Sequence, residues 1–84
     1  MAIKPQLFFF TMNENYTTYY KIIGEKIKKK RKEKGLTQQQ VAEKISKFDR
    51  SKISDIENGK EDFLFSTLLK ICDALDISLK ELID

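Results

Sequence analysis

The sequence predicts an all-α fold in which five helices form one small domain. Three observations predict it. Through most of the 84 residues, apolar side chains recur every three or four positions, which is the spacing of amphipathic helices. A capping residue between two apolar residues, the pattern of a helix start, occurs three times. The chain has one proline and no apolar run near the ~20 residues of a membrane span, so we expect no membrane association.

The amino-acid composition excludes several classes of catalytic and metal site. The chain has no histidine and one cysteine, so a zinc site built from these residues, a disulfide within the chain and a histidine-based catalytic triad are excluded. The three glycines are isolated and form no phosphate-binding loop. We therefore expect no enzyme and no cofactor, and a reducing, cytoplasmic setting. Cys72 lies on an apolar helical stripe, which favours an inert core residue over a reactive thiol.

The net charge of +3 is unevenly distributed along the chain. Residues 21–34 carry eight basic and two acidic side chains, whereas residues 36–84 carry seven basic and ten acidic ones. A block of like charge indicates either a nucleic-acid contact or a solvated helix face. Charge alone does not decide between them.

Residues 1–20 are interpreted as an aromatic N-terminal extension, and residues 21–84 as the domain. Six of the nine aromatic residues fall in this extension, and the cluster Leu7–Phe10 is apolar enough to need a cover such as another subunit. Whether the cluster is a strand or disordered stays open. The extension is therefore a candidate dimer contact.

The first helix is expected over residues 16–34, because Tyr19, Ile23 and Ile27 recur every four residues. Gly35 is expected to end this helix, since glycine commonly follows the last helical residue.

The next two helices begin at recognisable caps. A helix over residues 38–45 starts at a capping box formed by Thr37 and Gln40. A helix over residues 50–58 starts at Asp49. Each cap contributes about 1 kcal/mol, which is enough to fix a boundary in a small domain.

Two further helices complete the expected bundle. After the linker at residues 60–64, an apolar stripe predicts a helix over residues 65–75. A short fifth helix runs from about Leu79, next to a capping box of Ser78 and Glu81.

The helices at residues 38–45 and 50–58 are short and joined by the tight connection Ser46-Lys47-Phe48. This arrangement matches a helix-turn-helix and also an ordinary helical hairpin, so geometry alone leaves both open.

The residues from Ile23 to Ile83 resemble the phage-repressor type of helix-turn-helix domain, the XRE family. The matching segments are Arg31–Gln38, Val41–Ile45, Arg50–Lys60, Thr67–Ile71 and Ala74–Leu82. The resemblance implies a five-helix, repressor-like DNA-binding bundle. It also implies a cytoplasmic transcriptional regulator that binds double-stranded DNA as a homodimer, and any effector would be a separate protein.

By this resemblance the helix at residues 50–58 lies in the major groove. Ile53 and Ile56 are expected to face the core, which turns four candidates for base contacts outward. These residues are Arg50, Ser51, Ser54 and Asp55. Arg50 either bonds the O6 and N7 atoms of guanine or anchors a phosphate, and Asp55 either accepts from N4 of cytosine or repels phosphate.

A second group is expected to contact phosphates and position the domain. These residues are Thr37, Gln38, Lys47, Lys52, Asn58 and Lys60. Gln38 opens its helix, whose positive end favours phosphate, whereas Thr37 is first a cap. The resemblance also implies a structural ion pair between Arg31 and Glu57.

Two features depart from the family pattern. The turn before residue 50 is one residue longer, and the extra residue is placed at Lys47. Residues 47–62 carry four basic and five acidic side chains, whereas a DNA-reading surface is usually basic. The alternative function is therefore a protein-interaction module or an antitoxin-type partner protein, with weakened or lost DNA binding.

Overall fold

Five helices form the described part of the chain, which comprises residues 17–60 and 63–83 of the computed structural model, and no strand occurs there. They are α2 (Thr17–Glu33), α3 (Gln38–Glu43), α4 (Arg50–Glu57), α5 (Phe65–Leu75) and α6 (Lys80–Ile83). The predicted all-α fold of five helices is confirmed, and each helix bound lies within two residues of its prediction.

The N-terminal extension is described only at its end. Residues 1–16, including the cluster Leu7–Phe10, lie outside the described residues. The boundary expected at residues 20 and 21 falls inside α2, which begins at Thr17. Tyr19 belongs to the same four-residue repeat as Ile23, as expected for the helix predicted over residues 16–34.

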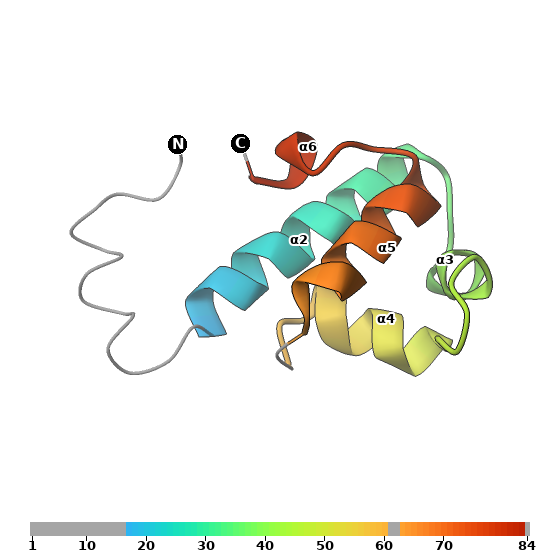
Figure 1. Ribbon diagram of the computed structural model, residues 1–84, viewed down its shortest axis with the longest axis horizontal. Coiled ribbons are helices and arrows are strands. Elements are labelled where there is room, and N and C mark those ends of the chain that lie inside the picture. Colours follow the sequence, from blue (N-terminus) through green and yellow to red (C-terminus); the bar gives the residue numbers. More distant parts are fainter. Residues whose placement is uncertain (1–16, 61–62, 84) are drawn as a thin grey trace.

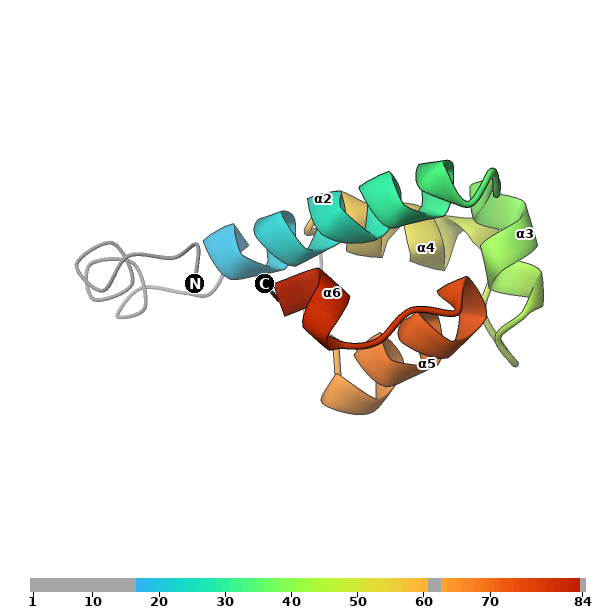
Figure 2. The same ribbon diagram turned by 90° about the horizontal axis from the view of Figure 1, so that it is seen from above.

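The helices are arranged in two layers. Figure 2 shows α2 and α4 in one layer and α5 and α6 in the other, with α3 closing one end of the bundle. In Figure 1 the chain runs from α2 through α3 into α4 and then returns across the bundle as α5. Helix α4 packs against both α2 and α3. Helix α4 therefore connects α3 to α2, the longest helix.

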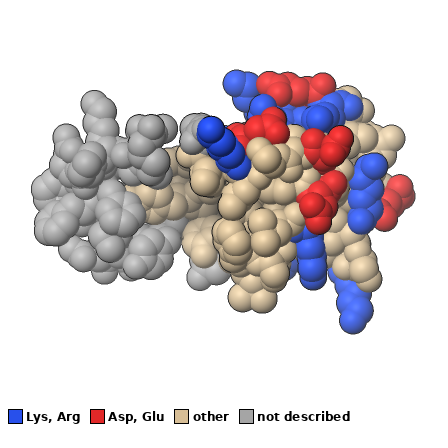
Figure 3. Space-filling model, turned by 45° about the horizontal axis from the view of Figure 1, so that its top comes forward, with Lys and Arg blue, Asp and Glu red and all other residues tan. Residues whose placement is uncertain are grey.

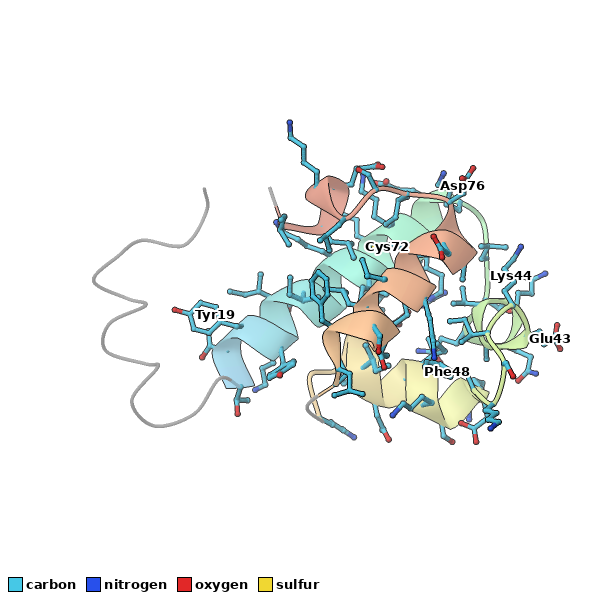
Figure 4. All side chains as sticks on the ribbon, viewed as in Figure 1. Tyr19, Glu43, Lys44, Phe48, Cys72 and Asp76 are labelled. Atoms are coloured by element: carbon cyan, nitrogen blue, oxygen red, sulfur yellow. The ribbon has the colours of Figure 1, made fainter. Side chains whose placement is uncertain are left out.

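One hydrophobic core joins all five helices. Its buried side chains are Ile27, Val41, Ala42, Ile45, Ile53, Ile56, Leu68, Ile71, Cys72, Leu75 and Leu82. Cys72 lies inside the bundle on α5 (Figure 4), and its burial is confirmed. Burial raises the pKa of this thiol, and the charges of Asp73 and Glu81 raise it further. The thiol therefore stays protonated and inert at neutral pH.

Helices α2 and α4 cross in close contact at Gly24. A Cβ atom at this position would lie 2.4 Å from the carbonyl oxygen of Ile56 and 2.5 Å from that of Glu57. Because real Cβ atoms do not approach backbone so closely, only glycine permits this crossing. Gly24 therefore sets the distance between α2 and the helix expected to read DNA.

The predicted helix starts carry the expected hydrogen bonds. The Thr37 hydroxyl accepts from the Gln40 backbone N–H at 3.0 Å, and the Gln40 side chain accepts from the Thr37 N–H at 2.8 Å. Asp49 Oδ1 accepts from the Lys52 N–H at 2.8 Å. At the third start, Glu81 Oε2 accepts from the Ser78 N–H at 2.9 Å, but the Glu81 N–H donates to the Ser78 backbone carbonyl oxygen at 3.1 Å and not to the hydroxyl, so half of the predicted capping box forms. These local bonds explain why the helix starts were predictable from sequence.

Candidate nucleic-acid interface

Helices α3 and α4 form the helix-turn-helix unit. Ile53 and Ile56 point into the core, with 1% and 0% of their surfaces exposed, as the sequence predicted. The connecting turn contains Lys47, an exposed residue whose φ of 67° is left-handed. A non-glycine residue adopts this conformation at some cost. The unusual backbone therefore coincides with the position at which the sequence placed the extra residue.

The four candidates for base contacts share the outer side of α4. Arg50 and Ser51 are exposed, whereas Ser54 and Asp55 are partly exposed. The Asn58 side-chain amide, at the end of the helix, donates to the Ser54 carbonyl oxygen at 2.9 Å. Asn58 thus caps α4 from within, in addition to its predicted role at a phosphate.

The residues Arg31 and Glu57 form a buried, two-pronged ion pair. Arg31 Nε lies 2.6 Å from Glu57 Oε2, and Arg31 Nη2 donates to Glu57 Oε1 at 3.1 Å. The third guanidinium nitrogen donates to the carbonyl oxygen of Leu36 at 2.7 Å. One side chain of α2 therefore holds both the end of α4 and the segment that leads into α3.

Gln38 extends this pair into a network. Its amide nitrogen donates to Glu57 Oε1 at 3.0 Å, and its amide oxygen accepts from Arg50 Nη1 at 3.5 Å. The network thus runs from Arg31 through Glu57 and Gln38 to Arg50. The sequence predicted Gln38 at a phosphate and Arg50 at a base, but it gave no indication that the two side chains meet.

The other phosphate candidates lie around this network. Thr37 is exposed, and its hydroxyl caps α3. Lys47 and Lys60 are exposed, and the Lys52 ammonium lies 5.8 Å from the centre of the Phe48 ring, within range of a cation–π interaction. Because α4 is eight residues long, its two ends are separated by about 12 Å. Lys60 therefore lies about one helix length from Arg50.

The structure alters the charge expected for this surface. Residues 47–60 carry four basic side chains and three acidic ones, which are Asp49, Asp55 and Glu57. Glu57 is buried and paired with Arg31, so only two of these acids face solvent. Over residues 47–62, setting the buried Glu57 aside leaves four basic and four acidic side chains, so the net charge of the segment rises from −1 to zero. On a different face, the one brought forward from the top of the Figure 1 view, Figure 3 shows basic and acidic side chains interspersed.

Within residues 17–60 and 63–83, no group of three or more histidine, cysteine, aspartate or glutamate side chains could hold a metal ion. Among the helices of these same residues, none is long and apolar enough to cross a membrane.

Three comparisons place this geometry among known proteins. The family model described as "Helix-turn-helix domain" matches residues 24–84. Among solved structures, the restriction-modification controller protein C.AhdI from Aeromonas hydrophila has a TM-score of 0.75 at 30% identity, covering 82% of this chain and 99% of its own. No curated protein sequence matches significantly.

Two more solved structures are similar. The clp gene regulator ClgR from C. glutamicum has a TM-score of 0.71 at 28% identity, covering 76% of this chain and 82% of its own. A variant of the restriction-modification controller protein C.Esp1396I has a TM-score of 0.69 at 34% identity, covering 76% of this chain and 80% of its own. All three likenesses extend over most of each protein.

Proposed function

Since this chain belongs to the helix-turn-helix domain family and is similar to transcriptional regulators, we propose that it is a sequence-specific regulator that binds double-stranded DNA with α4 in the major groove. The family is non-enzymatic. The observation that carries the proposal is the network from Arg31 to Arg50. It fixes α4 relative to α2 and α3 while leaving the first turn of α4 exposed.

Base recognition is assigned to Arg50, Ser51, Ser54 and Asp55. Arg50 stands at the exposed start of α4, and its contact with Gln38 limits the directions in which its guanidinium points. A guanidinium held in this way suits the bidentate recognition of guanine. The two serines supply short donors and acceptors, and Asp55 supplies an acceptor for cytosine.

Phosphate contacts are assigned to Thr37, Gln38, Lys47, Lys52, Asn58 and Lys60. Thr37 and Gln38 lie at the start of α3, Lys47 in the turn before α4, Lys52 within α4, and Asn58 and Lys60 after its end. Contacts of this kind position a domain on the duplex but do not read its sequence. The three lysines of this group supply the positive charge that phosphate contacts require.

The working form that we propose is a twofold dimer on two half-sites, about 34 Å apart, or one helical turn of DNA. Either α6, where Ile83 is 49% exposed, or the N-terminal extension supplies the contact. The similarity to two restriction-modification controllers and one gene regulator supports a role in controlling gene expression, which takes place in the cytoplasm.

The test is selection of bound duplexes from a random pool, followed by titration of the selected site in increasing salt. The proposal expects an enriched sequence whose affinity falls with salt, with a slope of about −0.9 for each neutralised phosphate. A scrambled duplex of the same length is the control, and it is expected to bind more weakly.

The second candidate function is a protein-interaction module or antitoxin-type partner protein. Its support is the pair of acids, Asp49 and Asp55, that remain on the surface of α4 and its cap. This candidate expects no binding to any duplex, selected or random, at low salt. Such a result would replace the regulator with the interaction module.

A further inference from the structure

An apolar pocket opens where the start of α2 meets the start of α5. Its volume is about 410 Å³, and it is lined by Tyr19, Tyr20, Ile23, Phe63, Phe65 and Leu68. Inside the lining, the rings of Tyr20 and Phe63 meet edge to face with their centres 4.9 Å apart. Tyr19 projects from the first turns of α2 (Figure 4). Pockets of this size hold small groups of apolar atoms but not a whole helix.

The rim of this pocket is unusually exposed for apolar residues. Phe65 is 62% exposed, and the neighbouring Leu64 is 73% exposed. Aromatic side chains are costly to leave in water, and contiguous apolar surface marks a contact site. The lining residues come from α2, from α5 and from the segment before α5 rather than from α4, so the pocket is separate from the side chains proposed to contact DNA.

We propose that the pocket is filled by the side chains of Leu7–Phe10 from the same chain. The sequence up to Tyr16 leads directly into Thr17, the first residue of α2, and residues of the first two turns of α2 line the pocket. The six residues between Phe10 and Thr17 span up to about 20 Å when extended, so the cluster reaches the pocket.

The chemistry of the occupant matches that of the pocket. Leu7–Phe10 is a run of one leucine and three phenylalanines without charge, and the pocket lining consists of aromatic and aliphatic side chains. Aromatic rings favour edge-to-face and offset contacts such as that of Tyr20 with Phe63. A segment on a short tether has an effective concentration of about the millimolar range, so it outcompetes a second copy of the protein at micromolar concentration.

The chain contains no tryptophan, which makes a direct test simple. Phe9→Trp introduces a single reporter into the full chain. The proposal expects its emission at shorter wavelength than that of free tryptophan, with reduced quenching by iodide, and expects both to be independent of protein concentration. Emission and quenching like those of a solvated tryptophan would overturn the proposal. The measurement is made without DNA, so its result is separate from that for the proposed function.

Two second-site variants show whether the reporter occupies this pocket. Phe65→Ser removes an exposed ring of the lining and is expected to return Phe9→Trp fluorescence to the solvated values. Leu69→Ser is the matched control, because Leu69 is also exposed on α5 but does not line the pocket. Circular dichroism verifies that both variants keep their helices. Equal effects of the two substitutions, or shielding that rises with concentration as a second copy would require, contradict the proposal.

Discussion

At the scale of single residues, the molecule depends on one buried charge pair. Glu57 accepts from Arg31 and from Gln38, so a carboxylate without contact with water keeps its hydrogen bonds. A buried charge that loses its partner is far more costly than a surface charge. The residues of this pair are therefore expected to affect stability, whereas Arg50, which Gln38 connects to the pair, is proposed to contact DNA.

Removing Arg31 should strongly destabilise the fold. Arg31→Ala leaves Glu57 buried without its partner, and we expect a loss of about 3–5 kcal/mol in the free energy of unfolding. Urea denaturation measures it. Lys32→Ala, an exposed neighbour on α2, is the control and should change stability by no more than about 0.5 kcal/mol. Equal effects of the two substitutions would mean that the pair is not buried in solution.

Arg50 and Lys52 should differ in how their loss changes DNA binding. Arg50→Ala is expected to cost about 1–3 kcal/mol and to relax preference at one base position, whereas Lys52→Ala should lower the salt slope by about one. Binding titrations against single-base variants of the selected duplex measure both effects. Lys29→Ala, which removes the same charge from α2, is the control. Uniform weakening across all duplexes by Arg50→Ala would make Arg50 a phosphate contact.

At the scale of helices, the sequence predicted where each helix begins and ends, but it did not predict how closely α2 and α4 cross. Caps such as Thr37 and Asp49 act on residues three positions away, so the sequence carries the whole interaction. Gly24 looked like an isolated glycine, because its role depends on a carbonyl oxygen of α4, 32 residues later in the chain. The contact of Gln38 with Glu57 was missed for the same reason. Local hydrogen bonds are readable from sequence, whereas the distance between helices is not.

A methyl group at Gly24 should push α2 and α4 apart. Gly24→Ala places a Cβ atom 2.4 Å from the carbonyl oxygen of Ile56, and overpacking of this kind costs about 1–3 kcal/mol. Helix propensity alone predicts the opposite, a gain of about 1 kcal/mol. Urea denaturation decides the sign, and the exposed neighbour Glu25→Ala is the control. A stabilised Gly24→Ala protein would show that the helices are farther apart.

The hydrogen bond and the charge of Glu81 at the start of α6 should increase the free energy of unfolding at neutral pH but not at acidic pH. The hydrogen bond from the Ser78 N–H lowers the pKa of Glu81 below its ordinary value of 4.5, and Lys30, 3.5 Å away, lowers it further. Because the pKa is lower in the folded state, this stabilisation is present above the ordinary value and is lost as pH falls through the folded value. Glu81→Gln should therefore destabilise the protein more at pH 7 than at pH 3 in urea denaturation. A difference that is the same at both pH values would show that the Glu81 charge is not involved.

At the scale of the whole molecule, the family resemblance predicted more than the residue patterns alone. It suggested the pair of Arg31 with Glu57, which no periodicity would reveal because the two residues lie 26 positions apart. Counting charges along residues 47–62 suggested an acidic surface, since a count cannot show that Glu57 is buried. The apolar pocket near α5 was likewise beyond the sequence, because its lining comes from α2 and from residues 63–68.

The mass of the protein in solution should show which of the two proposed surfaces forms the dimer. If α6 supplies the contact, Ile83→Asp places a charge on it and should shift the mass from about twice 9.9 kDa to 9.9 kDa. Deleting residues 1–11 should then leave the dimer intact. Light scattering after size-exclusion chromatography measures both variants. A monomer produced by the deletion and not by Ile83→Asp would assign the contact to the extension.

The nitrogen and the oxygen of the Gln38 side-chain amide make hydrogen bonds in different environments. The nitrogen donates to the buried carboxylate of Glu57 at 3.0 Å, whereas the oxygen accepts from the exposed guanidinium of Arg50 at 3.5 Å. If a DNA base draws Arg50 away, the amide oxygen can turn to water or to another donor while Glu57 stays satisfied. Under the proposed function, the first turn of α4 could thus exchange partners while its last turn stays bonded to Arg31, and DNA recognition would not reduce the stability of the fold.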